Sequence, residues 1–342
     1  MGRDTFATID LSKVSQNYKL LEGLSKTKVF GVVKANAYGH GSIELAKHLE
    51  TLGTPFLCVS SIDEALELIE NGIQNDILIF SYVSKQDIIK YHHENFAYTV
   101  TSKDWYESIK DLPMTLRLHV EINTGMNRYG IKESDINDLF QGHHIIEGVY
   151  THFNAPSINA STLKQMEEFK KLVTKLEQDV KWIHCGNAPM EFMADNSWIN
   201  GGRFGLGLYG YRLDCPQLQP VLHLTTKINH IDVLKAGDTL GYDATYTAHD
   251  DGIFAAIPIG YGDGFDLRNN TTSVYINDKA YPIVGKVCMD QTMLLIDSDV
   301  KFEDSVEIIG PHRTCFMIEK ETGMSVYIQL TGLSHRLKRI YI

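Results

Sequence analysis

The stretch KVFGVVKANAYGHG, residues 28–41, decides the fold prediction. It opens with a short apolar run, rich in β-branched and aromatic residues, of the kind that forms a buried strand. The run ends at Lys34, and a glycine-containing turn follows. A lysine at a strand end and enclosed by apolar walls has a lowered pKa, which suits it to Schiff-base or general-base chemistry. The competing interpretation is an ordinary solvated lysine.

Seven further apolar runs of similar length follow. They are PFLCVS (55–60), DILIFS (76–81), FAYTV (96–100), TLRLHVEI (115–122), IIEGVY (145–150), VKWIHC (180–185) and the weaker SWIN (197–200). The gaps between them leave room for helices, which are indicated by a capping box at 61–64 and an amphipathic pattern at 161–178. Repeated β–α units predict an α/β fold, a (β/α)8 TIM barrel whose catalytic groups lie at the carboxyl ends of the strands. An open doubly wound sheet is the alternative.

A different rhythm begins near residue 220. The segments 223–234, 237–248, 252–261, 272–287 and 291–297 combine strand-forming residues with Gly and Asn-Asp turns, which is typical of hairpins. One short helix is expected after Ser325. We therefore predict a barrel domain over residues 1–217 and a mostly-β domain over 218–342. The first ten or so residues are free to pack with the second domain.

The charge balance and the cysteines argue against several classes of protein. Lys and Arg number 32 against 43 Asp and Glu, a net charge of −11, which disfavours nucleic acid as a partner. No apolar stretch approaches the roughly 18–20 residues of a membrane span, and the N-terminus lacks a signal-peptide core. The five cysteines form no CxxC pair, so neither a disulfide framework nor a metal site is expected. We predict a cytoplasmic protein that does not bind membranes.

Two barrel loops carry candidate anion-binding groups. RFGLG (203–207) follows the eighth predicted strand, and HCGN (184–187) follows the seventh. Barrels often bind phosphate in these loops, through the main-chain N–H groups of a glycine turn. In the second domain, Tyr242 and Tyr261 could serve as acid or base if cations lowered their pKa, although hairpin tyrosines are usually packing residues.

Taken in order, these segments resemble the alanine racemase family. The matching motifs are VVKANAYGHG (32–41), NTGMNRYG (123–130), THF (151–153), HCGN (184–187), GGRFGLGLYG (201–210), GYDATYTA (241–248), IPIGYGDG (257–264), GKVCMDQ (285–291) and LSHRLKRIY (333–341). The resemblance implies a pyridoxal 5'-phosphate (PLP) barrel joined to a β domain, working as a head-to-tail homodimer with shared active sites. It also implies an isomerase that interconverts L- and D-alanine with two bases and supplies D-alanine for peptidoglycan.

The resemblance assigns the catalytic and substrate-facing roles as follows. Lys34 would bind PLP covalently and act as the base on the D-face. Tyr242 would enter the active site of the partner subunit and act as the base on the L-face. Tyr261 and Met289 would line the substrate entrance of that same partner site, and Arg128 would contact both PLP and substrate.

Other positions are implied to hold the cofactor. Tyr38 and the Gly205-Leu206 turn would bind its phosphate. Asn187 and His335 are implied to be cofactor-binding residues as well.

The pyridine ring would be held by a second group of side chains. His152 would lie against the ring, Arg203 would meet the ring nitrogen, and Arg128 would hold the phenolic oxygen. His184 would stand behind Arg203 as a supporting residue.

Three positions depart from the family pattern. Ala188 replaces a serine that usually follows the Asn of the HCGN-like motif, and His335 occupies a position where many members have tyrosine or another residue. Glu121 stands where many members have a lysine that becomes carbamylated. Because Glu121 already carries the negative charge, we predict that it pairs with Arg128, directly or through one water. The alternative is that Glu121 points outward from its strand.

Other hypotheses keep the barrel and change the activity. They are a racemase for another or a broader range of amino acids, such as serine, a PLP barrel decarboxylase, and a PLP-binding homeostasis protein. Tyr242 and the GYGDG segment favour a racemase, because a decarboxylase does not need a second α-proton base. The second domain argues against the homeostasis protein, which would consist of the barrel alone.

Overall fold

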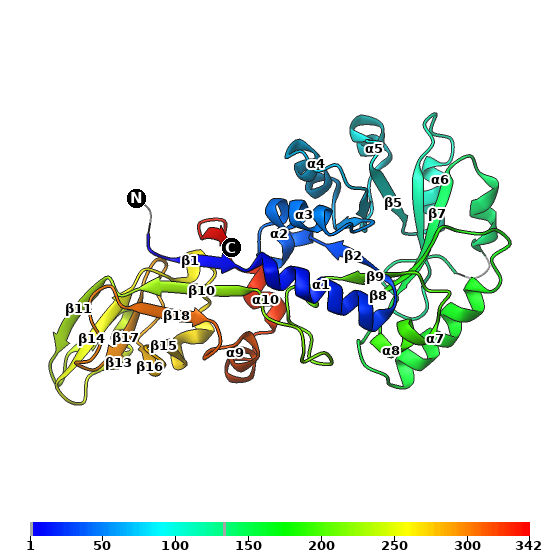
Figure 1. Ribbon diagram of the computed structural model, residues 1–342. Coiled ribbons are helices and arrows are strands. Elements are labelled where there is room, and N and C mark those ends of the chain that lie inside the picture. Colours follow the sequence, from blue (N-terminus) through cyan, green and yellow to red (C-terminus); the bar gives the residue numbers. More distant parts are fainter. Residues whose placement is uncertain (1–2, 133–134) are drawn as a thin grey trace. The chain divides into compact units, whose positions relative to one another are not determined.

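The computed structural model describes residues 3–132 and 135–342 (Figure 1). The chain divides into two compact units. One, the barrel unit, comprises Lys13–Ala37 and Ser42–Pro220. The other, the β unit, comprises Met1–Ser12, Tyr38–Gly41 and Val221–Ile342. The short segment Tyr38–Gly41 is thus assigned to the β unit, although the residues before and after it belong to the barrel unit.

The barrel unit is built on a closed parallel barrel, as the sequence predicts. Its strands are β2 (Lys28–Val32), β3 (Leu57–Val59), β4 (Ile77–Ile79), β5 (Phe96–Val100), β6 (Arg117–Glu121), β7 (Ile145–His152), β8 (Trp182–Gly186) and β9 (Gly201–Phe204). Each pairs in parallel with the next, and β9 closes the ring on β2 with Gly201 opposite Lys28. All carboxyl ends of these strands consequently open on one face of the barrel.

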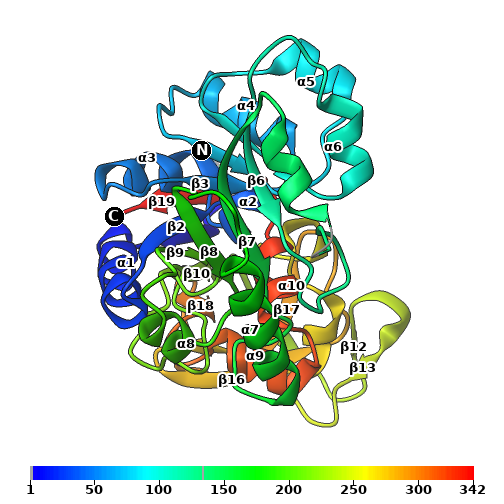
Figure 2. The ribbon, with the colours of Figure 1, turned by 90° about the vertical axis from the view of Figure 1, so that its right-hand side faces the viewer.

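Helices surround these strands on the outside (Figures 1 and 2). They are α1 (Leu11–Ser25), α3 (Ser42–Thr51), α4 (Ile62–Glu70), α5 (Lys85–Tyr91), α6 (Lys103–Ile109), η2 (Asn137–Gln141), α7 (Ala160–Val173) and α8 (Met190–Asp195). The predicted capping box is present at the start of α4, where Ser61 and Glu64 each accept from the other's main chain. These contacts satisfy N–H groups that a helix start leaves unpaired.

Two predicted boundaries are wrong. The eighth strand is Gly201–Phe204, not 197–200. Its glycines mask the strand signal, yet they are required, because a Cβ at Gly201 would lie 2.8 Å from the Cβ of His184. The helix expected over 161–178 ends at Val173, where the Thr174 hydroxyl donates to the Lys171 carbonyl. A β-branched residue with such a local bond weakens continuation of the helix.

The segment α2 (Lys34–Tyr38) is a left-handed turn. Ala35, Asn36, Ala37 and Tyr38 all have φ between 50° and 53°. The Ala37 N–H donates to the Val33 carbonyl at 2.8 Å, and the Ala35 N–H donates to Glu64 Oε1 at 2.7 Å. Left-handed conformations cost L-residues about 1–2 kcal/mol each, so these contacts offset a local penalty directly after Lys34.

The β unit contains a nine-stranded sheet in the order β11-β14-β17-β16-β15-β18-β10-β1-β19. The strands are β1 (Phe6–Ile9), β10 (Leu222–Lys227), β11 (His230–Leu234), β14 (Gly252–Ile257), β15 (Ser273–Ile276), β16 (Lys279–Val284), β17 (Thr292–Ile296), β18 (Ser305–Ile309) and β19 (Lys338–Tyr341). The N-terminal strand β1 pairs with β10 and β19. The helix expected after Ser325 is α10 (Val326–Thr331), and α9 (Cys315–Thr322) precedes it without having been predicted.

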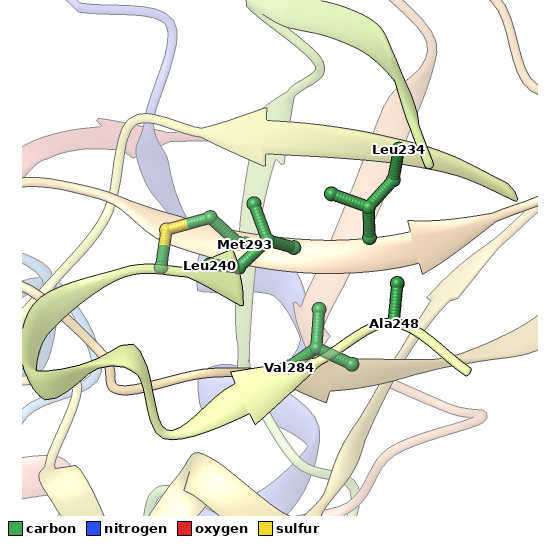
Figure 3. Packing of buried hydrophobic residues seen from close by; sticks show 5 residues of the cluster. All are labelled: Leu234, Leu240, Ala248, Val284 and Met293. Atoms are coloured by element: carbon green, nitrogen blue, oxygen red, sulfur yellow. The ribbon is translucent and has the colours of Figure 1, made fainter. Parts of the chain in front are cut away.

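A small hairpin of the β unit presents Tyr242. Strands β12 (Thr239–Leu240) and β13 (Tyr246–Thr247) enclose the short helix η3 (Tyr242–Ala244). The hairpin is anchored by an apolar cluster, shown in Figure 3, of Leu234, Leu240, Ala248, Val284 and Met293. Leu240 and Ala248 flank the hairpin loop, so the packing of this cluster fixes the base from which Tyr242 projects.

Among the residues that the structure describes, no helix is long and apolar enough to cross a bilayer.

Candidate active site

The carboxyl face of the barrel gathers the ionisable residues expected there. Lys34 lies two residues beyond the end of β2, Glu121 ends β6, His152 ends β7 and Arg203 lies in β9. Arg128 belongs to the loop after β6. Parallel strands bring their ends to one face, so residues more than 160 positions apart in sequence share one site.

Lys34 is partly buried in a cationic environment. Burial lowers its pKa, and the nearby charges of Arg128 and Arg203 lower it further, while Glu64 opposes them. No hydrogen bond joins its ammonium to any residue that the structure describes. A lysine with a depressed pKa and a free amine is suited to nucleophilic attack on a carbonyl and to proton abstraction.

Arg203 is held on two sides. One terminal nitrogen donates to His184 Nδ1 at 2.7 Å, and the other donates to the Thr151 carbonyl at 2.9 Å. The ring of Tyr150 stacks on the guanidinium, with its centroid 4.2 Å from Cζ. The Nε–H has no acceptor among residues 3–132 and 135–342, so it is the donor left for a ligand.

His152 is kept neutral beside these cations. Burial and the charges of Arg203, Arg128 and Lys34 lower its pKa to about 3. Its ring is therefore a flat, uncharged surface at neutral pH, which suits stacking against an aromatic ligand and adds no further positive charge.

Glu121 lies inside the barrel and is 4% exposed. It accepts a hydrogen bond from the Tyr150 hydroxyl at 3.0 Å. Burial raises its pKa, whereas Arg203, the Tyr150 hydroxyl and Arg128 lower it. Within the described residues it makes no direct ion pair with Arg128, so its immediate partner is Tyr150.

The loops after β8 and β9 offer main-chain donors. The N–H groups of Gly205 and Leu206 have no acceptor in the part of the chain that is described. They open a tight turn in which the Gly205 carbonyl accepts from Leu208. Asn187 has a φ of 54°, and its amide donates to the Phe153 carbonyl. Two adjacent free N–H groups form a cradle suited to an anion.

The remaining predicted site residues lie in the β unit. Tyr242 is 68% exposed, Met289 51% and Tyr261 45%. Tyr261 and Met289 are neighbours, since the N–H of Gly262 donates to the Met289 carbonyl at 2.9 Å. Tyr38 lies 6.2 Å from Tyr327 between ring centroids.

His335 is exposed in the loop before β19. It lies in the β unit with Tyr38, Tyr242, Tyr261 and Met289. The predicted site residues are thus divided between the two units.

The sequence did not assign a role in the site to three residues that the structure places there. Tyr150 contacts both Glu121 and Arg203, and its place two residues before His152 on an alternating strand could have indicated an inward side chain. His119 reaches His184 at 2.8 Å. Glu64 was assigned only to a helix cap, yet it also holds the turn that follows Lys34.

These groups fit the PLP that the sequence implies. A free amine at Lys34 matches its aldehyde, and the Gly205 and Leu206 N–H groups match its phosphate. The unused Arg203 Nε–H matches the pyridine nitrogen, and Arg128, which has no ion-pair partner among the residues described, matches an oxyanion. The excess of positive charge on this face suits the phosphate of the cofactor and the carboxylate of an amino-acid substrate.

Comparison with known proteins agrees with this chemistry. The family models described as "Alanine racemase, N-terminal domain" and "Alanine racemase, C-terminal domain" match residues 9–213 and 221–341. An alanine racemase from Staphylococcus epidermidis is 33% identical over 363 aligned positions, covering 99% of this chain and 95% of the relative.

Solved structures agree as well. An alanine racemase from Clostridium difficile matches with a TM-score of 0.92 and 30% identity, covering 100% of this chain and 96% of that one. The structure of alanine racemase from Bartonella henselae with covalently bound pyridoxal phosphate matches with a TM-score of 0.89 and 26% identity, covering 99% of each chain.

Proposed function

The chain belongs to the alanine racemase family, and on that premise we propose how its own residues interconvert L- and D-alanine with PLP. The observation that carries the proposal is the free, partly buried amine of Lys34 on a barrel face that also holds an unused Arg203 Nε–H. The enzyme is an isomerase, and its product D-alanine supplies peptidoglycan synthesis.

The barrel holds the cofactor. Lys34 would bind it covalently, Gly205 and Leu206 would donate to its phosphate, and His152 would lie against its ring. When bound, PLP withdraws electrons from the amino acid and makes its Cα–H acidic. Tyr38, Asn187 and His335 are proposed to complete the cofactor contacts.

Inversion at Cα requires proton transfer on opposite faces of one carbon, and therefore two bases. Lys34 exchanges the proton on the D-face, which its lowered pKa favours. Tyr242 exchanges the proton on the L-face. Its 68% exposure in a single chain supports a place in the site of a second subunit, because a catalytic phenol in bulk water would be poorly positioned.

Arg203 moderates the reaction. A guanidinium cannot pass a full proton to the pyridine nitrogen, because arginine is not deprotonated in proteins. It therefore donates a hydrogen bond only, which weakens electron withdrawal and suppresses side reactions such as transamination.

Arg128 would hold the phenolic oxygen of PLP, and Glu121 would supply a negative charge close to Arg128. Glu121 is proposed to supply, without carbon dioxide-derived modification, the negative charge that a carbamylated lysine brings in many relatives. Its carboxylate is fixed by Tyr150 and would orient Arg128 through one water, since the two make no direct ion pair among the described residues.

A homodimer follows from these assignments. Tyr242, Tyr261 and Met289 are all exposed on the β unit, and a second copy of the chain would cover them in its own active site. We propose that the protein works in the cytoplasm, where its substrate and PLP are available.

The test is racemisation by the purified protein with PLP. We expect D-alanine to form from L-alanine, with serine turned over more slowly. Lys34→Ala should abolish the visible absorbance of bound PLP and lower turnover by several orders of magnitude, because the covalent anchor and one base are both lost. The matched control is Lys28→Ala, at the start of the strand that precedes Lys34, whose ammonium pairs with Glu22 at the surface. Near-normal racemisation by Lys34→Ala would refute the proposal.

A further inference from the structure

Four buried polar side chains form a row inside the barrel, which begins at Arg203 and ends at Glu147. Arg203 contacts His184 Nδ1 at 2.7 Å, and His184 Nε2 contacts His119 Nδ1 at 2.8 Å. His119 Nε2 then faces the Glu147 carboxylate at 3.7 Å. Both histidines are fully buried, so no solvent substitutes for these contacts.

The strand between the two histidines is shaped to let them meet. His119 is on β6 and His184 is on β8, with β7 between them. A Cβ at Gly148 of β7 would lie 2.6 Å from His119 Nδ1, so only glycine leaves room for the ring. The pairing of β6 with β7 also shifts register at His119. The contact is therefore accommodated by the backbone of the barrel.

Arg203, at one end of this row, determines which ring nitrogen carries the proton in His184 and in His119. Its guanidinium can only donate, so His184 Nδ1 must accept and its proton must reside on Nε2. His184 Nε2–H then donates to His119 Nδ1, which places the His119 proton on Nε2, toward Glu147. Burial lowers the pKa of both histidines and keeps them neutral.

We propose that His119 and Glu147 are positioning residues for Arg203, acting through His184. The negative carboxylate favours the Nε2–H form of His119, and that form provides the acceptor that His184 needs. If His119 could not accept, His184 would turn or change tautomer and present an N–H to Arg203, displacing the guanidinium from the ring nitrogen. The inference rests on the proposed function, because it concerns the arginine that would meet PLP.

The proton positions can be seen directly. Neutron diffraction from deuterium-exchanged crystals of the PLP-loaded enzyme should show deuterium on Nε2 of His184 and His119, and none on Nδ1 of either. Deuterium on either Nδ1 would overturn the inference. If the protein takes up no PLP, the proposed function fails, while the same neutron map of the protein alone still decides the arrangement of protons.

Two matched variants separate positioning from simple stability. Glu147→Gln removes the charge that faces His119, and Arg117→Met breaks the same Glu147–Arg117 ion pair, which spans 2.9 Å, but leaves that charge in place. We expect Glu147→Gln to weaken PLP binding about three- to tenfold and to shift its visible absorbance, with Arg117→Met close to wild type. Equal effects of the two variants, or no effect of either, would contradict the inference.

A second pair of variants, at His119, distinguishes a loss of the acceptor from a loss of folding stability. His119→Asn keeps an acceptor near the position of Nδ1, whereas His119→Phe keeps an aromatic ring without one. The asparagine variant should hold PLP more tightly than the phenylalanine variant, even if the latter melts at the higher temperature. The reverse order of PLP affinity would show that ring packing alone positions Arg203.

Discussion

Replacing Leu240 by alanine tests how the β unit holds Tyr242. Leu240 is 8% exposed and packs in the apolar cluster at the base of the β12–β13 hairpin (Figure 3). The change removes the three terminal carbons of the side chain, worth about 0.8 kcal/mol each, and leaves a cavity. Because a two-stranded hairpin can relax into that space, we expect a loss of about 2.5–3.5 kcal/mol, in the lower part of the range for Leu→Ala changes.

Leu234→Ala is the matched control. Leu234 is 4% exposed and belongs to the same cluster, but it lies on β11 and does not flank the hairpin loop. Both variants should lose similar stability in denaturant unfolding. Only Leu240→Ala should speed amide hydrogen exchange around Tyr242 and lower kcat, by about tenfold or more, because a catalytic group displaced by an ångström loses much of its effect.

Two results would refute this reasoning. Equal losses of kcat in Leu240→Ala and Leu234→Ala would show that the cluster acts only through global stability. A wild-type kcat in Leu240→Ala, with faster exchange in the hairpin, would show that the position of Tyr242 is not set by its base.

Further perturbations address the two proposed bases and the buried acid. Tyr242→Phe should keep PLP but lose solvent-deuterium exchange at Cα of L-alanine; exchange at the wild-type rate would remove Tyr242 from that role. Mixing Lys34→Ala with Tyr242→Phe subunits should restore activity, because one site of a shared-site dimer then carries neither defect; activity no higher than that of the parents would place each site within one chain. Glu121→Gln should lower kcat/KM yet raise stability at neutral pH. The raised pKa of Glu121 makes the folded state lose stability as pH rises through the interval above the usual glutamate value, and glutamine abolishes that loss. Unfolding measured from pH 4 to 8 checks the sign, and a fully active glutamine variant would contradict the role of the charge.

Much of the fold could be predicted because apolar runs and turn residues are local signals. Seven barrel strands coincide with runs of β-branched and aromatic residues, as 96–100 illustrates with Phe96–Val100. The eighth could not be located in this way. Gly201 and Gly202 have low strand propensity, and the need for glycine at position 201 comes from His184 and Phe30, which only the closed barrel brings near.

In the candidate site, too, local sequence signals could be interpreted, whereas contacts between distant strands could not. The motif around Lys34 is contiguous, so its residues could be named from the sequence. The contacts of Tyr150 with Arg203 and of His119 with His184 join different strands, and no local pattern encodes the distance between their side chains. The direct partner of Glu121 was missed for this reason, since strand alternation predicts which way a side chain points but not what it meets.

The left-handed turn after Lys34 has a stereochemical consequence. Its four residues are L-amino acids in the mirror image of the right-handed helical conformation, which is the conformation that D-residues prefer. A D-alanine introduced at position 35 or 37 by chemical synthesis would adopt these dihedral angles without the penalty that L-alanine bears. The alanines of the turn beside Lys34 are thus one enantiomer in a shape that favours the other, the same pair of enantiomers that the enzyme interconverts.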